Sequence, residues 1–185
     1  KAERKQLENK WWNQSPEVSR AVASMLNANK GGKLYIGVLE NKKKYRGKAV
    51  REALDERMNC EELKGGVNLL LGIDAEIKAK GWDSDLLIQN INNQLKKDIH
   101  NSVIQHCIIK SHKVTDKEII EINISENSFM RVGWWINDEE LPLRENNQIN
   151  TMRGGTANRW LDEQSKKYQD KGREVLNVAE SGPVD

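Results

Sequence analysis

The side chains best able to do chemistry stand just after one short apolar segment of the sequence. Glu40 follows the apolar run 34–38, and Lys42-Lys43-Lys44 with Arg46 comes directly after it. A residue beyond the end of a strand is exposed, and loops in that position often carry binding or catalytic groups. A dense basic cluster can hold phosphate groups, although such clusters also occur as plain solvated surface. The pattern therefore indicates a phosphate-binding patch as one alternative and an ordinary polar turn as the other.

A second group of reactive residue types lies near the N-terminus. Glu3, Glu8 and Lys10 stand close together and are followed by Trp11-Trp12. Glu3 and Glu8 are five residues apart, so they share a face on neither a regular helix nor a regular strand. A bend between them could bring the two carboxylates together. Without such a bend they are ordinary surface glutamates.

A helix, a glycine turn and a strand are predicted to position Glu40. Ser15 or Asn13 can cap a helix whose apolar residues recur at helical spacing, and this helix is predicted to end near Asn29 to Gly32. Both glycines can adopt positive φ at little cost, which suits a helix end that runs straight into a strand. The run 34–38 is then predicted to be a strand buried on both faces, with Gly37 where another segment packs close.

The rest of the chain is predicted to mix helices with short strands. One helix covers 48–63, and a second starts at Asp83 or Ser84 with an inner face that includes Leu86 and Leu87. The apolar run 67–73 is predicted to be a strand or a buried helical turn, and 103–110 and 118–125 are predicted to be strands. A further strand is predicted at 129–136 and an edge segment at 141–143. From Ile149 a short strand is predicted to lead into a glycine turn and a polar helix. The turn at 115–117 makes a hairpin of two of these strands, and the segment from Gly172 onward is predicted to be a tail.

Composition limits the class of protein. The chain has 185 residues and a net charge of only +2, so one domain with a core is expected and the global charge does not demand a nucleic-acid partner. Cys60 and Cys107 have no partners at zinc-finger spacing, which favours a reduced, cytoplasmic protein without zinc. No apolar run approaches the length of a membrane span, so no membrane partner is expected. The start at Lys1 without a methionine suits a domain cut from a longer chain.

Several separate stretches match, in order, the pattern of one known family. They are Glu3 with Leu7-Glu8-Asn9-Lys10, Met25 to Gly32, Leu34-Tyr35-Ile36-Gly37-Val38, Glu40, Gly72 to Leu95, and Arg153-Gly154-Gly155-Thr156. On these residues the chain resembles the Schlafen AlbA-type domain, a nucleic-acid-binding domain of Schlafen proteins and of many prokaryotic defence and regulatory proteins. The sequence departs from the family pattern where Asn9 replaces an aromatic residue and where Glu40 stands in place of the more common Asp.

The resemblance implies an α+β fold, with a mixed or antiparallel sheet and helices packed on it. The domain would cover residues 1–161 with an insertion at about 48–66, and residues 162–185 would form a C-terminal helix and tail. Schlafen-type domains often work as paired lobes. A single copy therefore implies a homo-oligomer or a partner domain in a larger protein, by analogy alone.

The resemblance also implies a catalytic site. Animal Schlafen nucleases use three acidic residues for metal-dependent cleavage of RNA, chiefly tRNA, and the matching positions here are Glu3, Glu8 and Glu40. Three carboxylates suit Mg²⁺ or Mn²⁺, whose bound water can attack a phosphodiester. Lys10 would neutralise phosphate charge in the transition state. The Cys/His cluster of the animal proteins is missing, so no zinc site is carried over.

Three hypotheses follow. The first is a metal-dependent endonuclease that cuts RNA, such as tRNA, as an effector of anti-phage defence. In it Trp11 stacks on an unpaired base, and the phosphate contacts come from Lys42, Lys43, Lys44, Arg46 and Arg153. The second is a non-catalytic module that binds DNA or RNA, or a regulatory domain. The third is a scaffold domain that mainly contacts other proteins.

Overall fold

The computed structural model describes residues 15–28, 31–40, 61–62, 68–126, 133–146 and 148–180. The helices in this part of the chain are α2 (Ser15–Ala28), α4 (Asp74–Lys80), α5 (Ser84–Asp98), the 3-10 helix η2 (Asn101–His106) and α6 (Gly154–Glu180). The strands are β1 (Gly32–Ile36), β2 (Val38–Glu40), β3 (Glu61–Glu62), β4 (Asn68–Leu70), β5 (Cys107–Val114), β6 (Lys117–Ile124), β7 (Glu140–Glu145) and β8 (Gln148–Arg153). All strand pairs are antiparallel, and the mixture of helices with antiparallel sheets confirms the α+β class.

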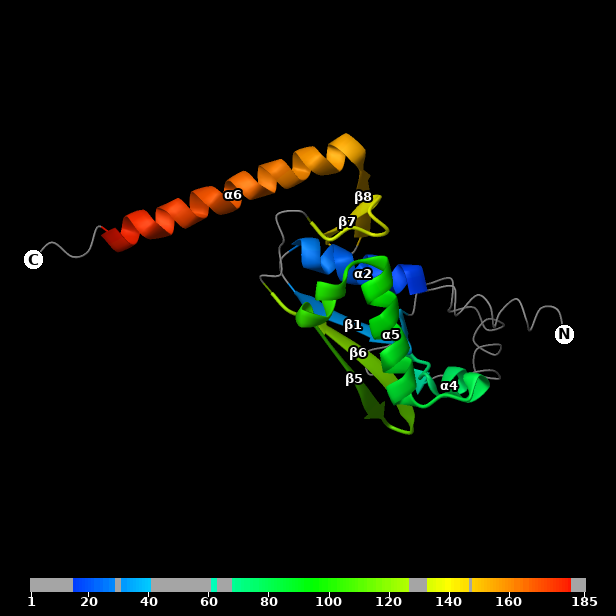
Figure 1. The fold of residues 1–185 in the computed structure, drawn as a ribbon. Helices are drawn as coiled ribbons and strands as arrows, with labels where there is room; N and C mark the ends of the chain where they lie inside the picture. Colours follow the sequence, from blue (N-terminus) through cyan, green and yellow to red (C-terminus); the bar gives the residue numbers. More distant parts are fainter. Residues whose placement is uncertain are drawn as a thin grey trace, which may run out of the picture.

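Helix α2 forms the middle layer of the molecule. Below it in Figure 1 lies the three-stranded main sheet, in the order β1-β6-β5, and above it lies the hairpin of β7 and β8. Every residue from Ala21 to Asn27 is buried, because this stretch has neighbours on both sides. A helix that is enclosed in this way must be apolar or internally satisfied all round. The predicted apolar stripe is therefore present, but residues on the other sides of the helix are buried as well.

One hydrophobic core lies between the main sheet and two helices. Ile120, Ile122 and Ile124 of β6 point into it and meet Leu26 of α2 and Leu95 of α5. Each of these side chains is at most 2% exposed, and full burial of such a side chain contributes about 1.5–3 kcal/mol. The opposite face of the main sheet, here called the outer face, carries Lys33, Tyr35, Ile108, Lys110, His112, Glu121 and Asn123.

Asn27 joins the layers through three buried hydrogen bonds. Its Nδ2 donates to the carbonyl oxygens of Trp134 (3.0 Å) and Pro142 (2.8 Å), and its Oδ1 accepts from the backbone N–H of Trp134 (2.8 Å). The side chain is 3% exposed, so water cannot replace these partners. Asn27 thus holds the segment that leads into β7 against the end of α2.

Gly37 separates β1 from β2. It has φ of +93°, and a Cβ there would lie 3.1 Å from the carbonyl carbon of Gly72 and 3.2 Å from Cγ2 of Ile119. Its carbonyl oxygen accepts from the N–H groups of Leu71 (2.8 Å) and Gly72 (2.9 Å). The expected close packing at Gly37 is confirmed. The chain leaves the main sheet here and enters a second sheet, in the order β2-β4-β3.

Some element predictions are wrong. The run 34–38 is not one strand buried on both faces, because it breaks at Gly37 and Tyr35 is 42% exposed. Leu86 lies on the outer side of α5 and is 38% exposed, whereas Leu87 is buried. The segment from Gly172 continues as helix α6 to Glu180 instead of forming a tail.

The remaining differences concern boundaries. The strand expected from residue 103 begins at Cys107 after a 3-10 helix, and residues 61–62, expected at a helix end, form β3. Helix α4 was not predicted. At 129–136 the described part shows a single bridge between Ile136 and Glu140. The run 67–73, for which the sequence allows a strand or a helical turn, contains strand β4.

Replacement of Asn27 by alanine should destabilise the fold. The change leaves the N–H of Trp134 and two carbonyl oxygens without their partner in a buried place. We expect the free energy of unfolding in urea to fall by about 3 kcal/mol. Asn93→Ala on the exposed side of α5 is the matched control and should change it by less than about 0.5 kcal/mol. A loss below about 1 kcal/mol for Asn27→Ala would show that the layers are not held in this way.

Candidate nucleic-acid interface

Most of the predicted site residues lie outside the described residues. These are Glu3, Glu8, Lys10, Trp11, Lys42, Lys43, Lys44 and Arg46. Glu40 is the last residue of β2, where its backbone pairs with Asn68 of β4. Arg153 is the last residue of β8 and immediately precedes helix α6. The positions that the structure describes are therefore Arg153 with its surroundings and the backbone of Glu40.

Arg153 borders an open groove of about 670 Å³. The groove lies where α2 meets the β7–β8 hairpin and the start of α6. Its lining residues are Glu17, Arg20, Glu140, Ile149, Thr151, Met152, Arg153 and Thr156. The hairpin positions Glu140 and the four lining residues between 149 and 153, because the register Glu140↔Arg153 and Leu141↔Met152 brings the start of β7 beside the end of β8.

Glu140 is the electrostatic centre of the groove. Arg20 Nε donates to its carboxylate at 3.1 Å, and Arg153 also donates to it through a guanidinium nitrogen. Arg20 further approaches Glu17, one turn earlier on α2, at 3.7 Å. The Glu140 side chain is 13% exposed and that of Arg153 is 70% exposed. The carboxylate therefore sits at the base while the Arg153 guanidinium remains largely open to solvent.

The two arginines shift the protonation equilibria in the groove. Hydrogen bonding from Arg153, followed by that from Arg20, holds the pKa of Glu140 below its usual range. The same hydrogen bond raises the pKa of Arg153. Glu140 therefore stays ionised at neutral pH and fixes both guanidinium groups. Arg153 keeps further donors beyond this ion pair, because a guanidinium has five N–H groups.

The described lining residues of this groove are suited to an anion more than to a hydrolytic reaction. Arginine donors and the hydroxyl groups of Thr151 and Thr156 suit phosphate oxygens. The start of α6 adds the partial positive charge of a long helix next to Arg153. Glu140 is engaged by two cations, so it is poorly placed to accept a proton from a nucleophile. The arrangement supports binding rather than cleavage at this place.

Sequence reasoning missed Arg20 and Glu140. Arg20 is a charged residue within a stretch where Ser19 and residues 21–27 are buried. Because a charge near the interior is costly without an ion-pair partner, its position indicates that such a partner is present. Glu140 stands directly before the predicted edge segment 141–143. Neither position reveals the other, because they are 120 residues apart in sequence.

Within the described ranges, no group of three or more His, Cys, Asp or Glu side chains could hold a metal ion. Glu3 and Glu8, two of the three expected ligands, lie outside these ranges. In the same part of the chain, no helix is both long enough and apolar enough to cross a membrane. Comparison of the chain with protein-family models, with curated proteins and with solved structures gives no match in any of the three.

The titration of Glu140 tests this electrostatic description. Because its folded pKa is lowered, the stabilisation by its ion pairs is fully present above the unfolded pKa of about 4.3 and is lost as the pH falls through the folded value. We expect Arg153→Gln to raise the Glu140 pKa toward its ordinary value, measured by ¹³C NMR of the carboxyl groups. Arg144→Gln on the same hairpin should leave it unchanged. If the pKa of Glu140 is the same in Arg153→Gln as in the wild type, Arg153 does not pair with Glu140 and does not belong to this site.

Proposed function

We propose that this chain is a Schlafen-type, metal-dependent endonuclease that cleaves RNA, with tRNA as the candidate substrate and anti-phage defence as the candidate role. The proposed metal ligands are Glu3, Glu8 and Glu40, and Lys10 is the proposed phosphate-neutralising residue. The proposal begins from the resemblance in the sequence and is supported by the way the described chain carries Glu40.

The observation that carries the proposal is the break at Gly37. Strand β2 is held by three antiparallel residue pairs with β4, so the backbone at Glu40 has a defined place at the end of a strand. Leu69 and Leu70 of β4 are at most 1% exposed, which anchors this second sheet in the interior. A carboxylate that takes part in chemistry needs such a rigid support.

The proposed donor set fits a hard divalent ion. Three carboxylates provide the oxygen ligands that Mg²⁺ or Mn²⁺ prefers. When bound, such an ion would supply an activated water and stabilise charge on the phosphate. The chain itself would orient the scissile phosphate, with Lys10 opposite the acidic residues and Lys42, Lys43, Lys44 and Arg46 along the backbone of the RNA. Trp11 is the proposed stacking residue for an unpaired base.

The groove at Arg153 supports the choice of a nucleic acid. Its two guanidinium groups and two threonine hydroxyl groups are suited to a phosphate backbone rather than to an apolar ligand. The groove also favours the second candidate function, a non-catalytic module that binds DNA or RNA, because its central acid is neutralised by two cations. Cleavage separates the two candidates, and binding alone does not.

The proposed nuclease should cut RNA only with a divalent ion and its three acids. We expect a tRNA substrate to be cleaved in Mg²⁺ or Mn²⁺ and to stay intact in excess chelator. Glu8→Ala and Glu40→Ala should each lower the cleavage rate by more than the ~100-fold that loss of an outer-shell partner costs. Gel electrophoresis of the end-labelled RNA measures the rate.

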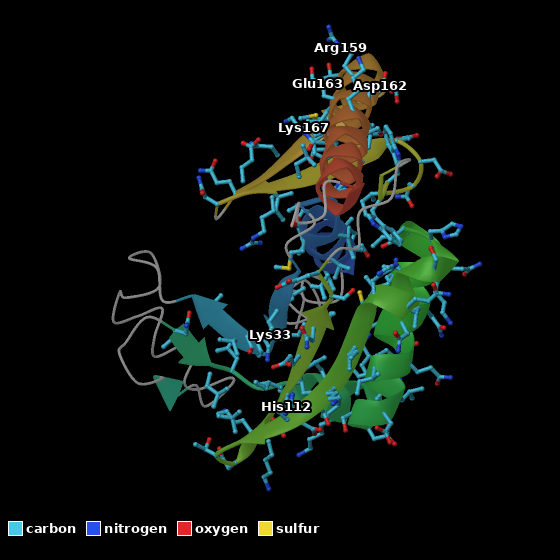
Figure 2. The ribbon with its side chains drawn as sticks, turned by 90° about the vertical axis from the view of Figure 1, so that its left-hand side faces the viewer. Lys33, His112, Arg159, Asp162, Glu163 and Lys167 are labelled. Atoms are coloured by element: carbon cyan, nitrogen blue, oxygen red, sulfur yellow. The ribbon has the colours of Figure 1, made fainter. Side chains whose placement is uncertain are left out.

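Glu163→Ala is the matched control for these acidic substitutions. Glu163 is an exposed residue of α6 (Figure 2). It lies far from Glu3, Glu8 and Glu40 in sequence. It should leave the cleavage rate unchanged, and circular dichroism should show all variants folded. Cleavage that persists in both Glu8→Ala and Glu40→Ala would refute the triad. Salt-sensitive binding without any cleavage would leave the non-catalytic module.

A further inference from the structure

The outer face of the main sheet is a two-row surface of polar and apolar side chains. In one row Lys33 of β1 and Ile108 of β5 flank Asn123 of β6. In the next, Tyr35 of β1 and Lys110 of β5 flank Glu121. Helices α2 and α5 cover the other face of the sheet, where they share the core with β6. Among the described elements, no helix packs over these two rows.

Glu121 organises the polar part of the outer face. Its two carboxylate oxygens accept from Lys33 Nζ at 3.2 and 3.3 Å, and His112 Nε2 lies 3.9 Å away. Lys33 and His112 come from the two strands on either side of β6 (Figure 2). Hydrogen bonding from Lys33 is the main cause that lowers the pKa of Glu121, and hydrogen bonding with Tyr35 acts in the same direction.

These contacts involve Lys33, Tyr35 and His112 but not Lys110. Lys110 stands opposite Glu121 in the strand register and is exposed. Its ammonium group is therefore the cation of this row that a new anionic ligand can approach. Lys33 is already held by Glu121 of the neighbouring strand β6. Its side chain therefore loses less conformational freedom when a second anion contacts it.

The apolar part of the outer face is small and divided. Tyr35 is 42% exposed and Ile108 is 58% exposed, and both are unusual for large side chains in strands of this core. They lie on the two outer strands, with β6 between them. Two separated side chains among charged groups offer too little apolar area for a stable protein interface. A tyrosine ring beside lysines is the combination that receives a base and its phosphate.

We infer that the outer face binds single-stranded nucleic acid, with a base stacked on Tyr35 and the adjoining phosphates contacting Lys110 and Lys33. A single strand is preferred to a duplex, because bases inside a duplex are stacked on one another and cannot reach the ring. The surface does not include the residues of the proposed reaction, so the inference can hold whether or not the chain cuts RNA.

Binding of a labelled single strand tests the inference. Fluorescence anisotropy of an oligo-uridine RNA of about 15 nucleotides, recorded at low salt with excess chelator, measures affinity without metal-dependent cleavage. We expect Tyr35→Ala to weaken binding at least about fivefold, the lower end of what one stacked base contributes. Tyr35→Phe should retain the affinity, because it keeps the ring. Leu86→Ala, at a comparably exposed apolar side chain of α5, should also retain it.

The lysine contact has its own readout. Lys110→Ala should reduce the slope of the logarithm of the binding constant against that of the salt concentration by about 0.7, the value for one phosphate contact with a single strand. Lys96→Ala, at an exposed lysine of α5, should leave the slope unchanged. Glu121→Gln should tighten binding, because the loss of a negative charge that repels the phosphates outweighs the loss of order at the Lys33 side chain. A basic peptide ligand would respond to Glu121→Gln in the opposite direction.

Three results would overturn the inference. They are no binding by the wild-type chain, equal binding by wild type and Tyr35→Ala, and a change in oligomeric state on Tyr35→Ala without a change in RNA affinity. The last would identify the face as a contact between copies. Absence of cleavage in Mg²⁺ together with Tyr35-dependent binding would refute the nuclease alone. Cleavage that depends on Glu8 together with Tyr35-independent binding would refute this inference alone.

Discussion

The enclosure of helix α2 is the constraint on which the other layers depend. Because the helix has neighbours on both sides, each polar group on it must find a partner within the protein. Ser19 donates to Asp98 at 2.7 Å, Ser24 donates to the carbonyl oxygen of Ala21 at 2.8 Å, and Asn27 bonds to Trp134 and Pro142. Two of these three side chains reach elements that lie far away in sequence, so the polar groups of α2 specify where α5 and β7 sit.

A contact between two glycines separates the main sheet from the second sheet. The backbone of Gly72 lies so close to Gly37 that a Cβ at Gly37 would meet its carbonyl carbon at 3.1 Å, whereas a Cβ at Gly72 would meet Cβ of Lys117 at 3.1 Å. This contact ends β1 directly after Ile36 and sends the next three residues into the second sheet. As a result Tyr35 stays on the outer face of the main sheet, while Glu40 leaves from another sheet. The six residues from Tyr35 to Glu40 thus contribute to two separate sheets.

Local signals in the sequence were sufficient for several elements. The cap by Asp83, whose Oδ1 accepts from the N–H of Leu86 at 2.8 Å, depends on residues three apart, and so it can be read from the chain. The same holds for the positive φ of Gly31 and Gly32 and for the turn of the β5–β6 hairpin. These features are decided by neighbours in sequence, and the structure confirms them.

Features that depend on distant partners could not be predicted. An apolar strand such as Leu34-Tyr35-Ile36 has the same composition whether one or both faces are covered, and here only one face meets the helices. The ion pair of Arg20 with Glu140 exists because α2 packs against β7, which no local pattern encodes. The prediction that the helix ends at Gly172 is wrong, because α6 continues to Glu180. A single glycine weakens a helix by only about 1 kcal/mol, so it does not have to end one.

The groove and the outer face share one electrostatic design. In each, a carboxylate lies among basic side chains from different elements: Glu140 between Arg20 and Arg153, and Glu121 between Lys33 and His112. The acid lowers the net charge of the surface, which agrees with a chain whose overall charge is only +2. It also orders the long basic side chains before any ligand arrives, so less conformational entropy is lost on binding. Under the two proposals made above, such surfaces would attract a polyanion weakly from a distance and select it by contact, through ring stacking at Tyr35 and guanidinium geometry at Arg153.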